Sequence, residues 1–303
     1  MYSVDKCPCC NEKKFTIYHA IVAPFISNYV LKKPVSTTSL VVCEVCSFRF
    51  YQERFTPNEV KQLYGEYRSE NYLKERHKYE FWYTEAVNAN LGNAPQEIID
   101  RNQRTYNFIH NLHPEKFQKI LDYGGDKGQF IPENLGEKSF VYEISSSEVV
   151  PGVQLIKDEG SLYAHQFDLL FLAHVLEHSS EPEELLKKIT SHLSDQNPHL
   201  YVEVPFERHH LSSITKVPGY LVYLNLLIRL PILLTAIDFL SIIFKRKFNL
   251  LPAGCFLKLH EHINFFNEKS LEILLKRSGF KVSKMQTYES DSNQVLMCLA
   301  VKV

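Results

Sequence analysis

The chain has 303 residues, of which 45% are hydrophobic and 23% charged, and its formal net charge is −1. This composition can support one large domain or two modest ones, and it excludes a disordered chain. The near-zero net charge provides no basic field, so we expect no nucleic-acid partner. Seven cysteines, and a first segment without the basic start and apolar core of a signal peptide, indicate a reducing, cytoplasmic location.

Four cysteines near the start of the chain form two C-x-x-C pairs. They are Cys7, Cys10, Cys43 and Cys46. Two such pairs can close one tetrahedral zinc site, because each pair supplies two thiolates from one tight turn. We therefore predict a small zinc-ribbon domain over residues 1–55, with a strand over residues 39–42 and a structural metal. Cys9 is an alternative ligand to Cys10, and a redox pair or four inert thiols are the alternatives to a metal.

Residues 56–115 are predicted to form a helical arm. Thr56 is placed as an N-cap, Pro57 as the first helical residue and Glu59 as the partner in a capping box. Aromatic and basic residues follow at near-helical spacing and could roof a ligand site: Tyr64, Tyr67, Arg68, Tyr72 and Arg76. Stacking of nucleic-acid bases on these rings is an alternative, but packing against the next domain is the simpler interpretation.

The predicted fold is centred on the stretch KILDYGGDKGQF, residues 119–130. An apolar run ends in Asp122, three glycines follow, and an apolar pattern then resumes. The glycines are Gly124, Gly125 and Gly128. This order is typical of a buried strand, a tight turn and a helix whose N-terminus presents free N–H groups to a ligand. A second apolar run ends in Glu143, which is placed to accept hydrogen bonds from ribose hydroxyls.

Two classes of cofactor use such a turn. A dinucleotide site needs a glycine where this chain has Asp126, because the backbone must approach a pyrophosphate there. S-adenosylmethionine (SAM) carries a positive sulfonium and no phosphate, so it tolerates an acidic turn. The stretch resembles motif I of the class I SAM-dependent methyltransferases, D-x-G-x-G-x-G, with Asp126 in place of the middle glycine. The resemblance implies that SAM binds over this turn.

The rest of the chain predicts a doubly wound, Rossmann-like parallel sheet. Strands are expected over residues 153–156, 167–172 and 200–205. Asp158 and His174 follow two of these strands and complete the predicted cofactor site. The runs FDLLFLAHVLEH and LYVEVP resemble the fourth and fifth strands of bacterial SAM methyltransferases. The likeness covers residues 116–303, which we take as the catalytic domain.

An insertion at residues 217–248 is nearly apolar enough for a transmembrane helix. Arg229, Pro231 and Asp238 lie within it, and predicted strands precede and follow it, so both of its ends must lie on one side of any membrane. We predict a pair of helices against the active-site edge of the sheet. Their apolar faces suit a lid over the acceptor, a homodimer interface, or a peripheral membrane contact in which the basic residues 245–247 reach lipid phosphates.

The run His260, Glu261 and His262 precedes the last predicted helix. It resembles the H-E-H-x-x-x-F run of sugar C-methyltransferases in deoxysugar biosynthesis, which also carry an N-terminal four-cysteine zinc domain. The resemblance implies an acid/base role near the acceptor for Glu261 and His262, with Leu259 at the position of the family's tyrosine. Metal ligation by His260 and His262, or a role in ordering the loop, is the alternative.

These features together predict a SAM-dependent methyltransferase that acts on a sugar, or on a surface-glycan or lipid-linked precursor. Such an enzyme must hold donor and acceptor in line, exclude water and remove a proton from the nucleophile. We expect His262 to accept that proton near neutral pH, oriented by Glu261. A nicotinamide-binding oxidoreductase, or an inactive binding module with the same fold, is the alternative.

Overall fold

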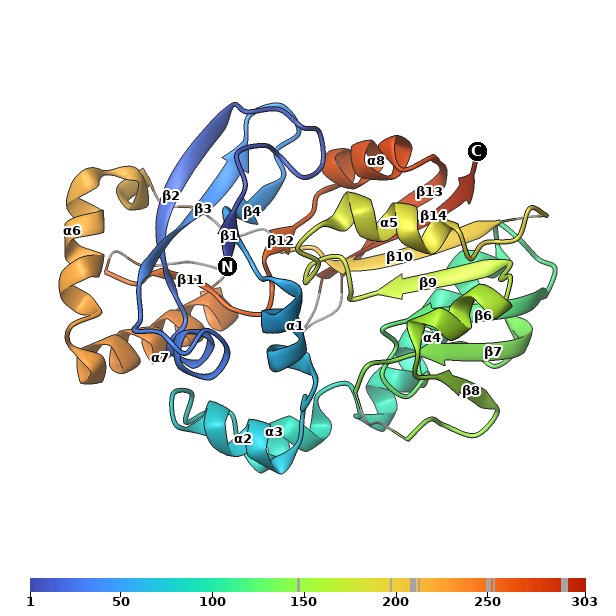
Figure 1. Cartoon of the computed structure of the whole chain (residues 1–303), viewed down its shortest axis with the longest axis horizontal. Helices are drawn as coiled ribbons and strands as arrows, with labels where there is room; N and C mark the ends of the chain where they lie inside the picture. Colours follow the sequence, from blue (N-terminus) through green and yellow to red (C-terminus); the bar gives the residue numbers. More distant parts are fainter. Residues whose placement is uncertain are drawn as a thin grey trace. The chain divides into compact units, whose positions relative to one another are not determined.

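The computed structural model describes residues 1–145, 148–196, 198–207, 211, 213–248, 252, 254–289 and 294–303, with the backbone alone at 213, 214 and 245–248. The chain divides into two units, each assembled from two separate parts of the sequence (Figure 1). Unit 1 is Met1–Glu85 with Glu207–Phe266, and unit 2 is Ala86–Phe206 with Asn267–Val303. This division differs from the three consecutive segments expected from the sequence, since residues 207–266 join the N-terminal part.

A seven-stranded sheet forms the centre of unit 2. In spatial order its strands are β13 (Phe280–Glu289), β14 (Gln294–Lys302), β10 (His199–Pro205), β9 (Leu169–Ala173), β6 (Phe117–Tyr123), β7 (Gly136–Tyr142) and β8 (Val153–Ile156). The five strands from β10 to β8 are parallel to their neighbours, whereas β14 is antiparallel to both β10 and β13. The predicted doubly wound sheet is confirmed, with an antiparallel strand pair added at one edge.

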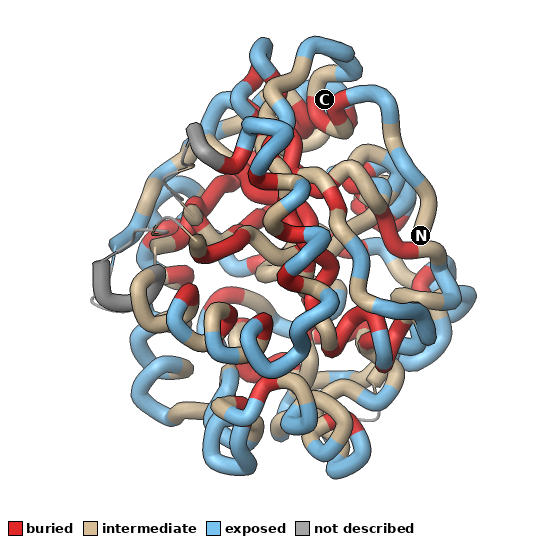
Figure 2. The backbone as a smooth tube through the Cα atoms, turned by 90° about the vertical axis from the view of Figure 1, so that its left-hand side faces the viewer, coloured by how far each residue is buried: buried red, intermediate tan, exposed pale blue. Residues whose placement is uncertain are grey.

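The helices of unit 2 begin at local signals in the sequence. They are α4 (Pro95–His110), α5 (Pro182–Thr190) and α8 (Glu268–Arg277), with a short 3-10 helix η2 (Glu159–Ala164). Proline occupies the first turn of α4 and α5, and Asn267 with Ser270 forms a capping box on α8. Phe108 and Ile109 of α4 join the buried core with Ile120 of β6. Surface helices accordingly alternate exposed and buried positions (Figure 2).

The crossover connection from β6 to β7 consists of successive turns. All residues from 124 to 135 are described, and none of them is helical. The N–H of Gly128 donates to the carbonyl of Gly125 at 2.9 Å, and that of Leu135 to the carbonyl of Pro132 at 3.1 Å. Pro132 lacks an N–H and disfavours a helical residue before it, so the short apolar stretch cannot continue as a helix. The prediction of a helix directly behind the glycine turn is therefore wrong.

Unit 1 is built on a five-stranded sheet. In spatial order its strands are β11 (Leu257–Leu259), β2 (Phe15–Val22), β3 (Thr37–Cys43), β4 (Arg49–Tyr51) and β12 (Asn264–Phe265), and β1 (Tyr2–Ser3) pairs separately with β5 (Glu53–Arg54). The predicted strand over residues 39–42 is thus confirmed as part of β3. β11 is parallel to β2 and β12 antiparallel to β4. The first 55 residues therefore share their sheet with strands from a part of the chain some two hundred residues later in sequence, as the 2.7 Å hydrogen bond from Arg54 to Asn264 (210 residues apart) illustrates.

Short helices surround this sheet. They are η1 (Ile26–Val30), α1 (Pro57–Tyr64), α2 (Glu70–His77) and η3 (Ser213–Lys216), whereas α3 (Glu85–Asn90) belongs to unit 2 apart from its first residue. The predicted capping box is confirmed, because the Thr56 side chain accepts from the N–H of Glu59 while the Glu59 carboxylate accepts from the N–H of Thr56. Tyr72 of α2 and Phe25 are buried in the main core of the unit.

The insertion forms the predicted pair of helices, α6 (Pro218–Leu227) and α7 (Pro231–Phe248), with a bend of 118° between them. Leu224 and Leu227 of α6 and Leu234 of α7 pack with Ile21 of β2. These contacts join the pair to the five-stranded sheet of unit 1, whereas the sequence predicts a position on the larger sheet. Among the described residues no single helix is long and apolar enough to cross a membrane; the bent pair satisfies length and composition together.

Candidate functional site

The carboxyl ends of three neighbouring parallel strands meet at one edge of the seven-stranded sheet. β6 lies between β7 and β9, so the chain order reverses at β6. Ligands of doubly wound sheets bind at such a reversal, outside the carboxyl ends of the strands. Asp122 is the next-to-last residue of β6, Glu143 follows β7, and His174 follows β9. The structure therefore brings these three predicted cofactor residues to one edge of the sheet.

The turn after β6 needs glycines, because a side chain at these positions would clash or strain the backbone. Gly124 has φ +74°, a left-handed conformation that favours glycine. A Cβ atom on Gly125 would lie 2.2 Å from the Asp122 carboxyl group, so a larger residue cannot occupy that position without moving Asp122. At Gly128 a Cβ atom would lie 2.8 Å from Val153 of β8. Gly128 thus allows the crossover to pack on β8, and its predicted role in cofactor binding remains a prediction.

Asp126 replaces the middle glycine of the motif and keeps a glycine-like backbone. Its φ is +54°, a region that Asp tolerates better than most residues. The N–H of Asp126 donates to Glu143 Oε2 at 3.1 Å, and the N–H of Ser145 donates to Glu143 Oε1 at 2.8 Å. These two N–H groups fix the Glu143 carboxylate in place. A carboxylate that accepts hydrogen bonds from ribose hydroxyls needs such a fixed position.

Asp122 is a buried carboxyl group with an incomplete set of partners. It is 1% exposed, and its Oδ1 has no hydrogen-bond partner among the described residues. Burial raises the pKa of Asp122 to about 7, against the attraction of Arg101. A carboxyl group in this state is suited to meet a positive charge on a ligand, which fits the sulfonium and amino groups of SAM.

Asp158 lies just after β8, as the sequence predicted, but it is engaged locally. Its carboxylate accepts from the N–H and the hydroxyl of Ser161, both at 2.9 Å, and so caps η2. These hydrogen bonds lower the pKa of Asp158. Asp158 is exposed, and its predicted role in cofactor binding stays a prediction.

His174 belongs to a buried ionic network that the sequence did not reveal. Its Nε2 lies 3.2 Å from Glu203 Oε1, and its Nδ1 lies 3.1 Å from Glu177 Oε1. Burial lowers the pKa of His174, but these two carboxylates more than offset that effect and raise it overall. His174 also has φ +59°. These contacts fix its ring at the end of β9, and its predicted role in cofactor binding stays a prediction.

Glu203 of β10 is the centre of that network. Its side chain is fully buried, and it lies 3.0 Å from Arg101 Nε and 3.2 Å from Arg104 Nη2. The Tyr201 hydroxyl donates to it at 2.6 Å. Burial alone would raise the pKa of Glu203, but Arg101 and the other partners lower it overall. A charged residue within an apolar strand was the one signal that could have singled out Glu203 beforehand.

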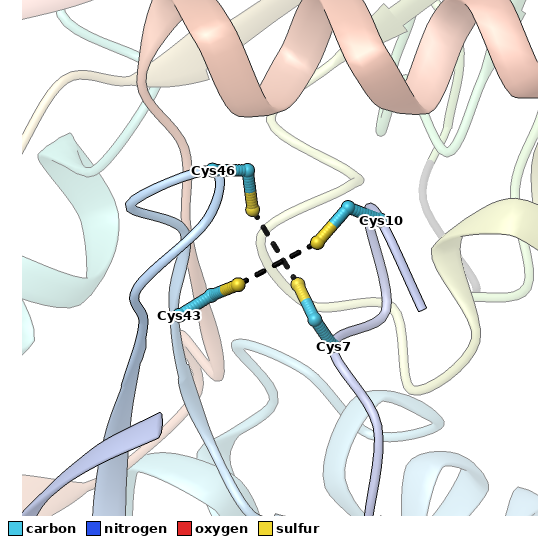
Figure 3. Close-up of side chains that lie close together, drawn as sticks. All are labelled: Cys7, Cys10, Cys43 and Cys46. Carbon is cyan, nitrogen blue, oxygen red and sulfur yellow. Dashed lines mark hydrogen bonds between the residues drawn. The ribbon is translucent and has the colours of Figure 1, made fainter. Parts of the chain in front are cut away.

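The four predicted zinc ligands come together in unit 1 (Figure 3). Their sulfur atoms point toward one another and all lie within 4.8 Å, with Cys7 to Cys46 and Cys10 to Cys43 both at 3.5 Å. Zinc–sulfur bonds of about 2.3 Å in a tetrahedron separate the sulfurs by roughly 3.8 Å. The cluster therefore fits a zinc ion, and it contains Cys10 rather than Cys9.

The electrostatics of these thiols also favour a metal. The hydrogen bond with Cys46 lowers the pKa of Cys7, and the same bond raises that of Cys46. Burial raises the pKa of Cys10 to about 11. Four sulfur atoms this close cannot all ionise without a cation between them, whereas a bound zinc ion stabilises thiolates.

The His260–Glu261–His262 run lies in unit 1, and each of its side chains has a partner from another element. Tyr72 donates to Glu261 Oε1 at 2.5 Å, and Arg76 Nη1 donates to the same oxygen at 2.8 Å. Tyr72 and Arg76 are two of the residues predicted to roof a ligand site. Burial and the Glu261 carboxylate raise the pKa of Tyr72, which keeps its hydroxyl protonated as a donor.

The two histidines of the run pair with different carboxylates. His260 Nε2 lies 3.0 Å from Glu80 Oε1. The other carboxylate oxygen of Glu80 lies 2.7 Å from Arg76 Nε. His262 Nδ1 lies 2.7 Å from Glu207 Oε1. The sequence predicts that Glu261 orients His262, but the carboxylate that pairs with Nδ1 of His262 is Glu207. Glu207 stands 55 residues from His262 and carries no motif, so the sequence does not reveal this pairing.

The comparison with known families identifies the chain. The profile of a family described as "Methyltransferase domain" matches residues 93–284, which is more than half of the sequence. The chain therefore belongs to this methyltransferase domain family, and the fold described above is a methyltransferase fold. This assignment favours a methyltransferase over the nicotinamide-binding oxidoreductase that the sequence leaves as an alternative. No curated protein sequence gives a significant match.

Solved structures similar to this chain include several methyltransferases. The 1,6-didemethyltoxoflavin-N1-methyltransferase of Burkholderia thailandensis, with its acceptor and S-adenosylhomocysteine bound, is 12% identical with a TM-score of 0.47, covering 88% of this chain and 96% of that one. The magnesium protoporphyrin IX methyltransferase of Synechocystis is 12% identical with a TM-score of 0.42, covering 68% and 84%. The N-methyltransferase NodS of Bradyrhizobium japonicum is 11% identical with a TM-score of 0.39, covering 70% and 90%. The family assignment rests on the match over residues 93–284, not on these structures.

Proposed function

We propose that this protein is a SAM-dependent methyltransferase whose acceptor is a sugar or a glycan precursor. The observation that carries the proposal is the turn after β6, where the buried Asp122, the left-handed Gly124 and the Glu143 carboxylate lie at the reversal point of a methyltransferase sheet. When bound, SAM supplies a methyl group on a positively charged sulfur, already activated for displacement. Glu143 accepts hydrogen bonds from its ribose, and Asp122 faces its positive charge.

The candidate base is His262, which the Glu207 carboxylate holds through Nδ1 at 2.7 Å. The carboxylate favours the imidazolium that forms when the ring accepts a proton from the acceptor. Glu261 is fixed by Tyr72 and Arg76, and its carboxylate can accept hydrogen bonds from hydroxyl groups of the acceptor. A sugar acceptor is supported by the carboxylates of Glu207 and Glu261 and by the Tyr72 ring beside Glu261. The resemblance of the run to sugar C-methyltransferases supports it as well.

Glu143→Ala is expected to weaken SAM binding by on the order of 1–3 kcal/mol, the scale of a lost charge-assisted hydrogen bond. Isothermal titration with SAM measures the change, and titration with NAD tests the oxidoreductase alternative. Glu133→Ala is the matched control, because Glu133 is an exposed carboxylate of the same crossover and its loss should leave affinity unchanged. Equal SAM affinity in both variants would remove Glu143 from the site.

His262→Asn is expected to lower the rate of methyl transfer by about 10²–10⁴-fold without changing SAM affinity, because only proton removal is lost. Glu207→Gln should lower the same rate roughly tenfold to a hundredfold, since the base loses its orienting charge. The measurement is methyl transfer from radiolabelled SAM to panels of nucleotide-linked and isoprenoid-phosphate-linked sugars.

His110→Asn, at an exposed histidine of α4, is the control for loss of an imidazole elsewhere in the chain. If the unchanged protein binds SAM but methylates no member of either sugar panel, the sugar acceptor is ruled out for these classes and the inactive binding module gains support. A His262→Asn enzyme as fast as the His110→Asn enzyme would show that His262 is not the base.

A further inference from the structure

The outer surface of the α6–α7 pair is apolar and open. Ile232 is 90% exposed, and it stands beside the bend between the two helices. Further large apolar residues of the two helices and of the turn between them are about half exposed or more: Val222, Leu226, Leu230, Leu233 and Leu240. Single exposed apolar residues are common on proteins, but this many on two consecutive helices indicate a contact surface.

The polarity of α7 is reversed relative to a helix on a water-facing surface. Its buried positions Leu234, Asp238 and Ser241 follow helical spacing on one face, and two of the three are polar. Asp238 is satisfied there by Lys258, whose Nζ lies 2.8 Å from Asp238 Oδ2. The exposed positions Ile232, Ala236 and Leu240 lie one turn apart on the other side. A helix that turns its carboxylate inward and its isoleucine outward is suited to a non-aqueous surrounding.

The charged residues of the α6–α7 pair indicate which kind of surface the pair contacts. Residues 217–248 contain one acidic residue, Asp238, and four basic ones: Arg229, Lys245, Arg246 and Lys247. Arg229 is exposed next to the bend and forms no ion pair with any residue that the structure describes. A symmetric contact between two copies would place like charges together, whereas phospholipid headgroups supply negative charge at the level of the helix backbone.

We propose that the α6–α7 pair lies in the surface of a membrane that contains anionic phospholipids. The bend and its apolar residues enter the acyl region by about 5–10 Å, and Arg229 remains among the phosphates. Each arm is too short to cross a bilayer alone, because a span needs about 20 apolar residues. The proposal goes beyond methyl transfer, and its test does not depend on that activity.

The test is co-flotation of the full chain with vesicles of phosphatidylcholine alone and of phosphatidylcholine mixed with phosphatidylglycerol. We expect binding to the mixed vesicles, weakened roughly tenfold to a hundredfold by Ile232→Ser, since that residue contributes the burial energy of a full isoleucine side chain. Ile99→Ser is the matched control, because Ile99 is an exposed isoleucine of α4, in the other unit. Arg229→Gln should weaken binding to the mixed vesicles only.

Trp82 gives an independent readout. It is the single tryptophan of the chain, and its ring stacks on Phe239 of α7 with centroids 5.9 Å apart. Its fluorescence should therefore be quenched by brominated acyl chains when the unchanged protein binds vesicles, and less so for Ile232→Ser. Equal flotation of Ile232→Ser and Ile99→Ser would overturn the proposal. So would a dimer in lipid-free solution that Ile232→Ser dissociates, in a protein that does not float with either vesicle.

Discussion

The Cys10→Ala variant is expected to purify without zinc and to unfold at a lower temperature than the unchanged protein, which should hold about one zinc ion per chain. The Cys10 and Cys43 sulfurs are 3.5 Å apart, so one missing ligand opens the cluster. Structural zinc contributes on the order of 10 kcal/mol of apparent binding free energy, and that energy is shared with folding. Elemental analysis and thermal unfolding measure the two effects.

Cys9→Ala is the matched control, because Cys9 is the sequence neighbour of Cys10, is fully buried and lies outside the four-sulfur cluster. This variant should keep its zinc and most of its stability. Loss of zinc from Cys9→Ala but not from Cys10→Ala would assign the ligand to Cys9. Unchanged protein without any metal, purified in the absence of chelators, would contradict the zinc site itself.

The Glu203→Gln variant is expected to lose about 3–5 kcal/mol of unfolding free energy, the cost of leaving buried positive charge without its partner. The substitution preserves the shape of the side chain but removes the charge that pairs with Arg101 and Arg104 at 3.0 and 3.2 Å. Tyr201 also loses its charged acceptor. Denaturant unfolding followed by circular dichroism measures the difference.

Glu183→Gln is the control for this prediction, because Glu183 pairs with Arg277 at 2.7 Å but at the surface of the same unit. Its loss should cost no more than about 1 kcal/mol. The folded-state pKa of Glu203 lies below its ordinary value, so its contribution is present at neutral pH and disappears as the pH falls through the acid range. The unchanged protein should therefore lose more stability between pH 5 and pH 2 than Glu203→Gln; parallel curves would contradict the role of Glu203.

Features set by near neighbours in the chain followed from the sequence. The Thr56–Glu59 capping box joins residues three apart, and the β8 strand has the predicted bounds Val153–Ile156. Asp122 and Glu143 stand at strand ends because the apolar runs before them end there. The helix expected after Gly128 shows where local pattern is insufficient, since Pro132 and the short distance to β7 outweigh a resumed apolar periodicity.

What the sequence by itself determined is therefore the methyltransferase sheet, the four-cysteine cluster and the position of Asp122 and Glu143 at the ends of their strands. Turn chemistry, helix caps and strand periodicity act over a few residues, so they can be read along the chain. Only the tertiary structure decided that Tyr72 meets Glu261 across 189 residues and that Glu207, not Glu261, pairs with Nδ1 of His262. Such pairings depend on how separate elements pack, because a buried charge takes whichever partner the fold brings to it.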